Sequence, residues 1–332
     1  MKRGDFLIGV GAGLVSAVLF ATVIRGSLAG ILLFYLTPLP VAIVSLGWNH
    51  RAGLLASFVG AIAVGLVFDL QSGLMFALAF SLPIWWLAFL TLLARDGVAS
   101  AAPGKGSADI HWYPLGSLAL WVAGISVVLT LAGALMLGPS YEVYHATVEK
   151  LVEGVFNGGL AGEIDGLPGV GANGVPVEDV ARFVASVVVP MSAAASTLLT
   201  LVIMLVAAKL VALSGRLPRA LPRIAREFEL PRVTLLGLFA SFAIAPFGGW
   251  PRFVALALAA TIAMLLAMQG LATVHVLVWR IAARPLILGM GYAMIVVAEP
   301  WTVGALAVLG LAELVFSLRA RSLGGHLSTR GE

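Results

Sequence analysis

The chain has 332 residues, of which 61% are hydrophobic and only 11% are charged, and its formal net charge is +4. Soluble domains carry about 25% charged residues, so this composition excludes an ordinary soluble protein. Long apolar runs recur from one end to the other, and the alternating pattern of a membrane β-barrel is missing. The sequence therefore predicts an all-α, polytopic transmembrane helical bundle.

The apolar runs define the expected membrane helices. A helix needs about 20 residues to cross the hydrocarbon core, and about 17 is the usual lower limit. Segments 233–248 and 285–299 fall short, so they are either half-helices or partly re-entrant, and eight to ten membrane segments are expected. Met1-Lys2-Arg3 resembles the start of a secretory signal, but the many later spans favour a retained first span. The expected segments are 6–24, 28–47, 52–69, 73–93, 114–137, 184–213, 233–248, 252–279, 285–299 and 301–317.

The distribution of Lys and Arg predicts the orientation. With ten spans and the N-terminus inside, the cytoplasmic side holds fifteen of the 20 Lys and Arg residues, and the outer side holds only Arg25, Lys150, Arg182 and Arg252. Basic residues concentrate in cytoplasmic loops of membrane proteins. We therefore expect both termini to be cytoplasmic. Losing two neighbouring spans would preserve this orientation.

A long outer acidic connection over 138–183 separates membrane helices over 1–137 from membrane helices over 184–332. The second group of helices contains a long inner connection over 214–232. Glycine-rich residues 157–174 are expected to form a loop. The acidic connection is either a solvated surface or a surface that recruits a partner. Before the glycines, apolar residues at helical spacing predict a short amphipathic helix; they are Tyr141, Tyr144, Val148, Leu151 and Val155.

The inner connection over 214–232 is basic. Its arginines alternate with Leu, Ile and Phe, which suits an interfacial segment resting on anionic headgroups. Nucleic-acid binding is not expected, because Pro218, Pro222 and Pro231 interrupt any long basic helix. The basic composition is thus explained by the membrane alone.

The glycines of Gly9-Val-Gly-Ala-Gly13 predict close helix packing, since Gly9 and Gly13 form a small-xxx-small pair. A dinucleotide site is not expected there, because no strand precedes the glycines. No Walker A loop, His-Glu-x-x-His motif or Gly-x-Ser-x-Gly elbow occurs. The chain has no cysteine, and its five histidines are never spaced at i, i+3 or i+4. We therefore expect no metal, no cofactor and no catalytic residue.

Polar residues within the last apolar segments are the candidate binding residues, because a polar group in hydrocarbon is costly. His275 either contacts a substrate or relays protons, or it simply bonds a neighbour near the inner end of its span. Glu299 lies either between two discontinuous helices at a binding site or in a plain turn beside Trp301. Glu313 either contacts substrate or pairs with an arginine at the inner rim. The full candidate set is Gln269, His275, Glu299, Glu313 and Arg319.

Other polar residues near the ends of spans are expected to have structural roles. Asp69 closes an apolar segment, and Lys209 is placed to extend towards the phosphates of the bilayer. The adjacent Trp85 and Trp86 either pack in the core or line a cavity. These residues are not part of the candidate set.

Three segments together resemble the YybS-like family of uncharacterised bacterial polytopic membrane proteins. They are residues 82–86 (Leu-Pro-Ile-Trp-Trp) in the segment that ends at Arg95, residues 269–275, and residues 309–319. In that family the last helix ends in a pattern like Leu-Gly-x-x-Asp-x-x-x-Asp-Phe-Arg. Glu313 matches the first acid and Arg319 the arginine, whereas Ser317 replaces the second acid. The family is similar in organisation to the substrate-binding subunits of energy-coupling-factor vitamin transporters.

The resemblance implies a small molecule bound within the bundle and docking on a separate energising module. The leading hypothesis is accordingly a small-molecule binding or transport subunit without its own ATPase, embedded in the lipid bilayer of a bacterial inner membrane, as the resemblance to a bacterial family implies. The alternative is a structural or regulatory membrane protein that recruits partners through the outer acidic or inner basic connection. An intramembrane enzyme acting on a lipid is the weakest hypothesis, because the sequence offers only scattered acids and one embedded histidine.

Overall fold

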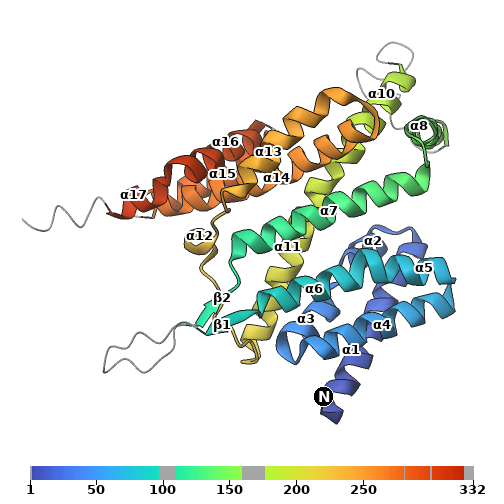
Figure 1. Cartoon of the computed structure of the whole chain (residues 1–332), viewed down its shortest axis with the longest axis horizontal. Coiled ribbons are helices and arrows are strands. Elements are labelled where there is room, and N and C mark those ends of the chain that lie inside the picture. Colours follow the sequence, from blue (N-terminus) through green and yellow to red (C-terminus); the bar gives the residue numbers. More distant parts are fainter. Residues whose placement is uncertain (1, 97–109, 159–175, 280, 300, 325–332) are drawn as a thin grey trace, which may run out of the picture. The chain divides into compact units, whose positions relative to one another are not determined.

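The computed structural model describes residues 2–96, 110–158, 176–279, 281–299 and 301–324 (Figure 1). The structure is 84% helical, which confirms the predicted helical architecture. Within the described residues, seven helices have the length and apolar composition to cross a membrane: Arg3–Ile24, Leu28–Gly47, His50–Val67, Leu70–Thr91, Leu115–Leu137, Glu178–Leu213 and Gly249–Leu277.

Three shorter apolar helices complete the described set: Val233–Phe247, Arg284–Val297 and Trp301–Phe316. The first two lie where the short segments 233–248 and 285–299 were expected, and the third lies within the expected segment 301–317. All ten expected apolar segments are therefore helical, although three of them are shorter than a full crossing requires.

Residue contacts divide the chain into two compact units, Met1–Val122 with Leu199–Phe228, and Ala123–Leu198 with Glu229–Glu332. These units cut across the three consecutive segments expected from the sequence, because α7 (Leu115–Leu137) and α11 (Val189–Leu213) each contribute residues to both.

The first unit is built from α1 to α6, a small hairpin and the ends of two long helices. Its elements, besides parts of α7 and α11, are α1 (Arg3–Ala21), the 3-10 turn η1 (Thr22–Arg25), α2 (Leu28–Tyr35), α3 (Leu39–Gly47), α4 (His50–Val67), α5 (Leu70–Met75), the π-helical turn η2 (Phe76–Ser81), α6 (Leu82–Thr91), β1 (Ala94–Asp96), β2 (Ile110–Trp112) and α12 (Ile224–Glu227).

The antiparallel pair β1–β2, in which Arg95 faces His111, was not expected in an all-α chain. Three-residue strands outside the apolar segments are too short to produce a recognisable alternating pattern. The hairpin is a small addition to a helical unit.

Helices α1 and α4 cross at glycines, as the small-xxx-small pair predicted. A Cβ atom added at Gly9 would lie 2.8 Å from the Ala52 carbonyl oxygen, and one at Gly13 would lie 2.5 Å from that of Ala56. Only glycine permits the two backbones to approach this closely. The packing interpretation of these glycines is confirmed.

The second membrane-length segment is interrupted between α2 and α3. Pro40 has no N–H to bond the carbonyl of Leu36, which accepts instead from Leu39 at 2.9 Å. The residues at the break form a turn, and the Thr37 carbonyl oxygen accepts a hydrogen bond of 2.8 Å from the Ser16 hydroxyl. Thr37 is fully buried.

The second unit consists of a peripheral helix and a group of apolar helices. Its elements, besides parts of α7 and α11, are α8 (Tyr141–Gly158), α10 (Val177–Phe183), the π-helical turn η3 (Val184–Val188), α13 (Val233–Ile244), the 3-10 turn η4 (Ala245–Phe247), α14 (Gly249–Leu277), α15 (Arg284–Val297), α16 (Trp301–Phe316) and α17 (Leu318–Gly324).

Helix α8 is the amphipathic helix expected before the glycine-rich stretch. Tyr144 and Val148 are buried and Glu142 is exposed, as the spacing predicted. Leu151, assigned to the apolar face, is 55% exposed instead. Most of the predicted loop over 157–174 lies outside the described residues.

We predict that Gly13→Ala lowers the free energy of unfolding by about 1–3 kcal/mol, because the new methyl group overpacks against backbone. Gly11→Ala is the matched control, since a Cβ there meets nothing within 4 Å. It should be neutral or stabilising by up to about 1 kcal/mol through helix propensity. Thermal unfolding of both purified variants checks this, and equal melting temperatures would contradict the crossing.

Candidate functional site

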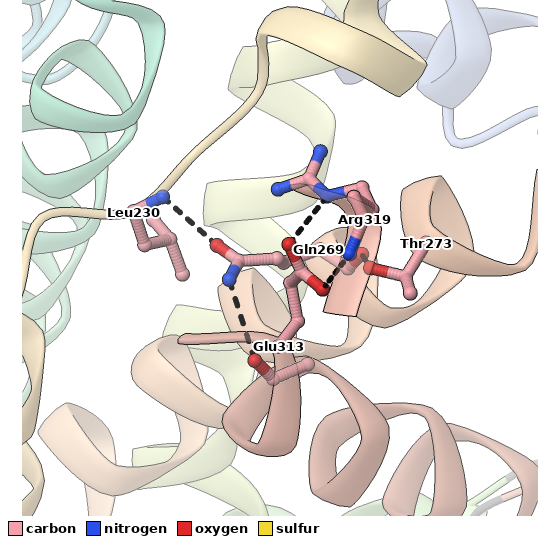
Figure 2. A network of polar contacts seen from close by, with 6 residues as sticks. Leu230, Gln269, Thr273, Glu313 and Arg319 are labelled. Carbon is pink, nitrogen blue, oxygen red and sulfur yellow. Dashed lines mark hydrogen bonds and ion pairs between the residues drawn. The ribbon is translucent and has the colours of Figure 1, made fainter. Parts of the chain in front are cut away.

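A network of buried polar groups joins α14, α16 and α17 in the second unit (Figure 2). We call it the Gln269–Glu313 network; it consists of Leu230, Gln269, Thr273, Gly310, Glu313 and Arg319. It contains three of the five residues in the candidate set. Its position follows from the way that α14 and α16 pack.

Helices α14 and α16 approach closely at Gly270 and Gly310. A Cβ atom at Gly270 would collide with the Leu306 carbonyl oxygen, and one at Gly310 would collide with that of Leu266. The two glycines thus face each other across the crossing. Gln269 precedes Gly270 directly, and its side-chain amide reaches the Gly310 carbonyl oxygen on the facing helix.

The Gln269 side chain is fully buried and uses both ends of its amide. Its Oε1 accepts a 2.8 Å hydrogen bond from the Leu230 backbone N–H, and its Nε2 donates to the Gly310 carbonyl oxygen at 3.3 Å. Leaving a buried donor or acceptor unpaired costs about 1–3 kcal/mol. Gln269 therefore attaches the segment before α13 to the crossing of α14 and α16.

Glu313 and Arg319 form a buried ion pair at the end of α16. Arg319 Nε lies 2.8 Å from Glu313 Oε1, and the Arg319 backbone N–H donates to Oε2 at 3.0 Å. Only 5% of Glu313 and 6% of Arg319 is exposed. Ser317 makes the pairing possible, because its φ of 51° turns the chain between α16 and α17.

Both carboxylate oxygens of Glu313 are thus bonded within the chain. The sequence gave two alternatives for Glu313, contact with a substrate or pairing with an arginine. The arrangement in the structure is the pairing with an arginine. Figure 2 shows the Glu313 carboxylate directed at Arg319 and the Gln269 amide directed at Leu230. The network is equipped to hold three helices and a connecting segment together.

His275 lies outside this network. Its Nδ1 is 2.9 Å from the Leu271 carbonyl oxygen, and its Nε2 is 3.3 Å from the Tyr292 hydroxyl of α15. Because a carbonyl oxygen only accepts, Nδ1 carries a proton and donates to it. This arrangement agrees with the simpler alternative for His275, a residue hydrogen-bonded to its neighbours near the end of its helix.

Glu299 is exposed and lies in the turn after α15. Trp301, at the start of α16, is 82% exposed. This arrangement is a plain turn beside an exposed tryptophan, one of the two alternatives for this residue. The structure therefore brings Gln269, Glu313 and Arg319 together, and leaves His275 and Glu299 at other places in the second unit.

Outside the candidate set, Asp69, Trp85 and Trp86 contact other residues of the first unit. Asp69 begins α5, since its carboxylate accepts from the Ser72 backbone N–H at 2.7 Å. Lys209 is exposed. Trp85 donates to the His50 carbonyl oxygen at 2.8 Å, and Trp86 stacks edge-on against Trp121.

In the first unit, arginines of the connection over 214–232 contact other parts of the chain. Arg219 donates to the carbonyl oxygens of Tyr113 at 3.0 Å and Thr91 at 3.4 Å, and Arg216 lies 4.5 Å above the Trp48 ring. Burial lowers the pKa of the Arg219 guanidinium, and Glu227 partly offsets this. Arg219 thus stabilises the end of α6 and the hairpin, and Arg216 contacts the end of α3, uses that the sequence did not reveal.

A second candidate feature, which sequence reasoning missed, is Thr37 in the break between α2 and α3. Its Oγ1 is buried and has no hydrogen-bond partner among the described residues. The signal available in the sequence was the pair Pro38 and Pro40, which follows Thr37 within an apolar segment. Among the described residues, no group of three or more His, Asp or Glu has the arrangement to hold a metal ion.

No family model, no curated protein and no solved structure matches the chain. Its classification therefore depends on its own features. The seven long apolar helices among the described residues indicate a multi-pass helical membrane protein.

We predict that Glu313→Gln destabilises the protein by about 3–5 kcal/mol, because Arg319 is left as a buried charge without its carboxylate. The double variant Glu313→Leu with Arg319→Met should recover part of this loss, since no buried charge remains. Thermal unfolding of the three proteins measures the difference.

Asp179→Asn is the matched control, because it removes an exposed Asp179–Arg182 pair with side chains 51% and 62% exposed. Its cost should stay below about 1 kcal/mol. Equal losses for Glu313→Gln and Asp179→Asn would contradict the assignment of a buried, structurally important pair.

Proposed function

We propose that the protein is a small-molecule binding or transport subunit of a bacterial inner membrane, without its own ATPase. The observation that carries this proposal is the fully buried Thr37 hydroxyl in an interrupted apolar segment, which has no hydrogen-bond partner in the part of the chain that the structure describes. Discontinuous membrane helices are a recurrent device of transporters, in which the break exposes polar groups to the substrate or coupling ion.

A buried hydroxyl at position 37 needs an energetic explanation. A buried polar group without a partner costs about 1–3 kcal/mol, and most such groups have a functional or solvent-related explanation. A bound molecule that hydrogen-bonds Thr37 would offset the cost. The π-helical turn η2, in the same unit, adds a second irregularity of a kind frequent at functional sites.

The proposed arrangement has ten membrane segments and cytoplasmic termini. The distribution of Lys and Arg supports it, and the seven helices of membrane-spanning length together with the three shorter apolar helices match the ten expected segments. A separate energising module is proposed as the partner; the sequence resemblance to the YybS-like family and to the substrate-binding subunits of energy-coupling-factor transporters implies it, and no comparison tests it.

Within this proposal the original candidate residues take different roles. Gln269, Glu313 and Arg319 hold the helices of the second unit together, because their main polar contacts are made inside the chain. His275 remains a candidate for substrate contact through its partly exposed pair with Tyr292. Glu299 is the weakest of the five, since it is exposed in a turn.

The test is equilibrium binding of a broad panel of vitamins and metabolites to the purified protein. For a ligand that binds, we predict that Thr37→Val weakens affinity about threefold to tenfold, the effect of losing one hydrogen bond. Without ligand the same variant should be as stable as the parent or more stable, because a buried unpaired hydroxyl is removed.

Thr197→Val is the matched control. Thr197 is equally buried, but its hydroxyl already bonds the Ala193 carbonyl oxygen of its own helix at 2.8 Å. The Thr197→Val substitution should therefore leave the affinity for the ligand unchanged. If folded protein binds nothing in the panel, or Thr37→Val and Thr197→Val affect affinity alike, the proposal fails.

A second candidate is a structural or regulatory protein that acts through membrane partners. The specific observation in its favour is α15, an apolar helix with no buried residue, which has room for a partner's helix. Crosslinking followed by mass spectrometry tests it. Stoichiometric capture of one membrane protein, unaffected by Thr37→Val, would favour this function over small-molecule binding.

A further inference from the structure

Helix α8 is held on the second unit by a cluster of aromatic rings. We call this cluster the α8 dock; it consists of Tyr141, Tyr144, His145, Trp250 and Phe253. Tyr144 is fully buried, with its ring centroid 5.4 Å from that of Trp250 and 5.6 Å from that of Phe253. Its hydroxyl donates a 2.8 Å hydrogen bond to the Ala185 carbonyl oxygen.

The Ala185 carbonyl is available because of the π-helical turn η3 and the proline behind it. In this turn the Val189 N–H bonds the Val184 carbonyl, five residues back. The next bond in that register would join residue 190 to Ala185, but Pro190 has no N–H. The Tyr144 hydroxyl supplies the missing donor, so docking of α8 completes the hydrogen bonding of the long helix.

His145 is the one member of the α8 dock whose charge changes near neutral pH. Its ring centroid lies 4.6 Å from that of Tyr141 and 5.5 Å from that of Tyr144. Its Nε2 is enclosed and has no hydrogen-bond partner among the described residues. A proton on this nitrogen would be a buried, unpaired donor on a charged ring, which the docked arrangement disfavours.

The charged groups around His145 come from three elements. Burial is the largest influence and lowers the pKa of His145; Glu149 on α8 raises it, and Arg182 on α10 lowers it. Arg182 is paired with Asp179 at 2.8 Å. The remaining charged groups on the elements packed here are Glu142, Lys150 and Glu153 on α8, Glu178 on α10 and Arg252 on α14, whereas α7 and η3 contain none.

We propose that α8 is a pH-responsive latch on the π-helical turn of the long helix, docked while His145 is neutral and released when His145 takes up a proton. Release withdraws the Tyr144 hydroxyl from Ala185 and leaves the η3 carbonyl without its donor. Acidification on this side of the protein is thereby linked to the helix that passes from the second unit into the first.

The direction of the pH effect follows from the two states. An exposed histidine has a pKa of about 6.5, and docking lowers it, so the released state binds more protons. Docking therefore has full strength above about pH 6.5 and weakens as the pH falls from there towards the pKa of docked His145. Over that interval the docking equilibrium changes by up to about tenfold for each pH unit.

The chain contains no cysteine, so single cysteines report docking cleanly. Val148→Cys places a thiol at a position that is 4% exposed in the docked helix, and Ala146→Cys places one on the exposed face of the same helix. The full-length protein is labelled with a neutral methanethiosulfonate reagent at pH 7.5 and at pH 5. Dividing the rate for Val148→Cys by that for Ala146→Cys removes the intrinsic pH dependence of the thiol.

The expected result is a labelling ratio that is low at pH 7.5 and rises several-fold at pH 5. In a His145→Gln background the ratio should stay low at both values, and in a His145→Lys background it should be high at both. A Tyr144→Phe background should raise the ratio at pH 7.5 while keeping the rise at pH 5. A ratio independent of pH, or a rise that persists in His145→Gln, overturns the proposal.

Discussion

Polar groups inside apolar surroundings must find their partners within the chain, and the described structure is arranged around this constraint. Gln269 satisfies the buried N–H of Leu230, and Tyr144 satisfies the carbonyl of Ala185. Each bond joins segments about 40 residues apart, with separations of 39 and 41. A long-range polar contact of this kind is specific in a way that apolar packing alone is not, because sliding one helix would leave a donor or acceptor unpaired.

Proline is the local origin of two of these requirements. Pro40 and Pro190 each lack the N–H that a regular helix would use, and each stands near a break or a π-helical turn. The consequences differ between the two places. At Ala185 the missing donor is replaced by a tyrosine from another helix. Near Pro40 the chain turns, and the buried Thr37 hydroxyl finds no partner among the residues described. The first irregularity suits a docking contact and the second a binding contact.

Much of the helical architecture was predictable, because long apolar segments and a repeated glycine spacing are local signals. The spacing of Gly9 and Gly13 predicted a close helix crossing. Glu313 lies near Arg319 in the sequence, so pairing with an arginine was one of its two expected roles. The partners of Gln269 and Tyr144 were not predictable. They depend on which helices cross and at what height, and apolar segments pack on several sides with nearly equal energy. The positive φ of Ser317 and the β1–β2 hairpin likewise have no strong sequence signal.

The two bonds of the Gln269 amide also set an order of events during synthesis. Leu230, which donates to Oε1, precedes Gln269 in the chain, but the Gly310 carbonyl that accepts from Nε2 follows 41 residues later. At about 5–20 residues per second, that carbonyl emerges several seconds after α14. During this delay the Gln269 Nε2 lacks the partner that it has in the complete structure. The polar contacts of α14 are therefore completed only once α16 has been synthesised.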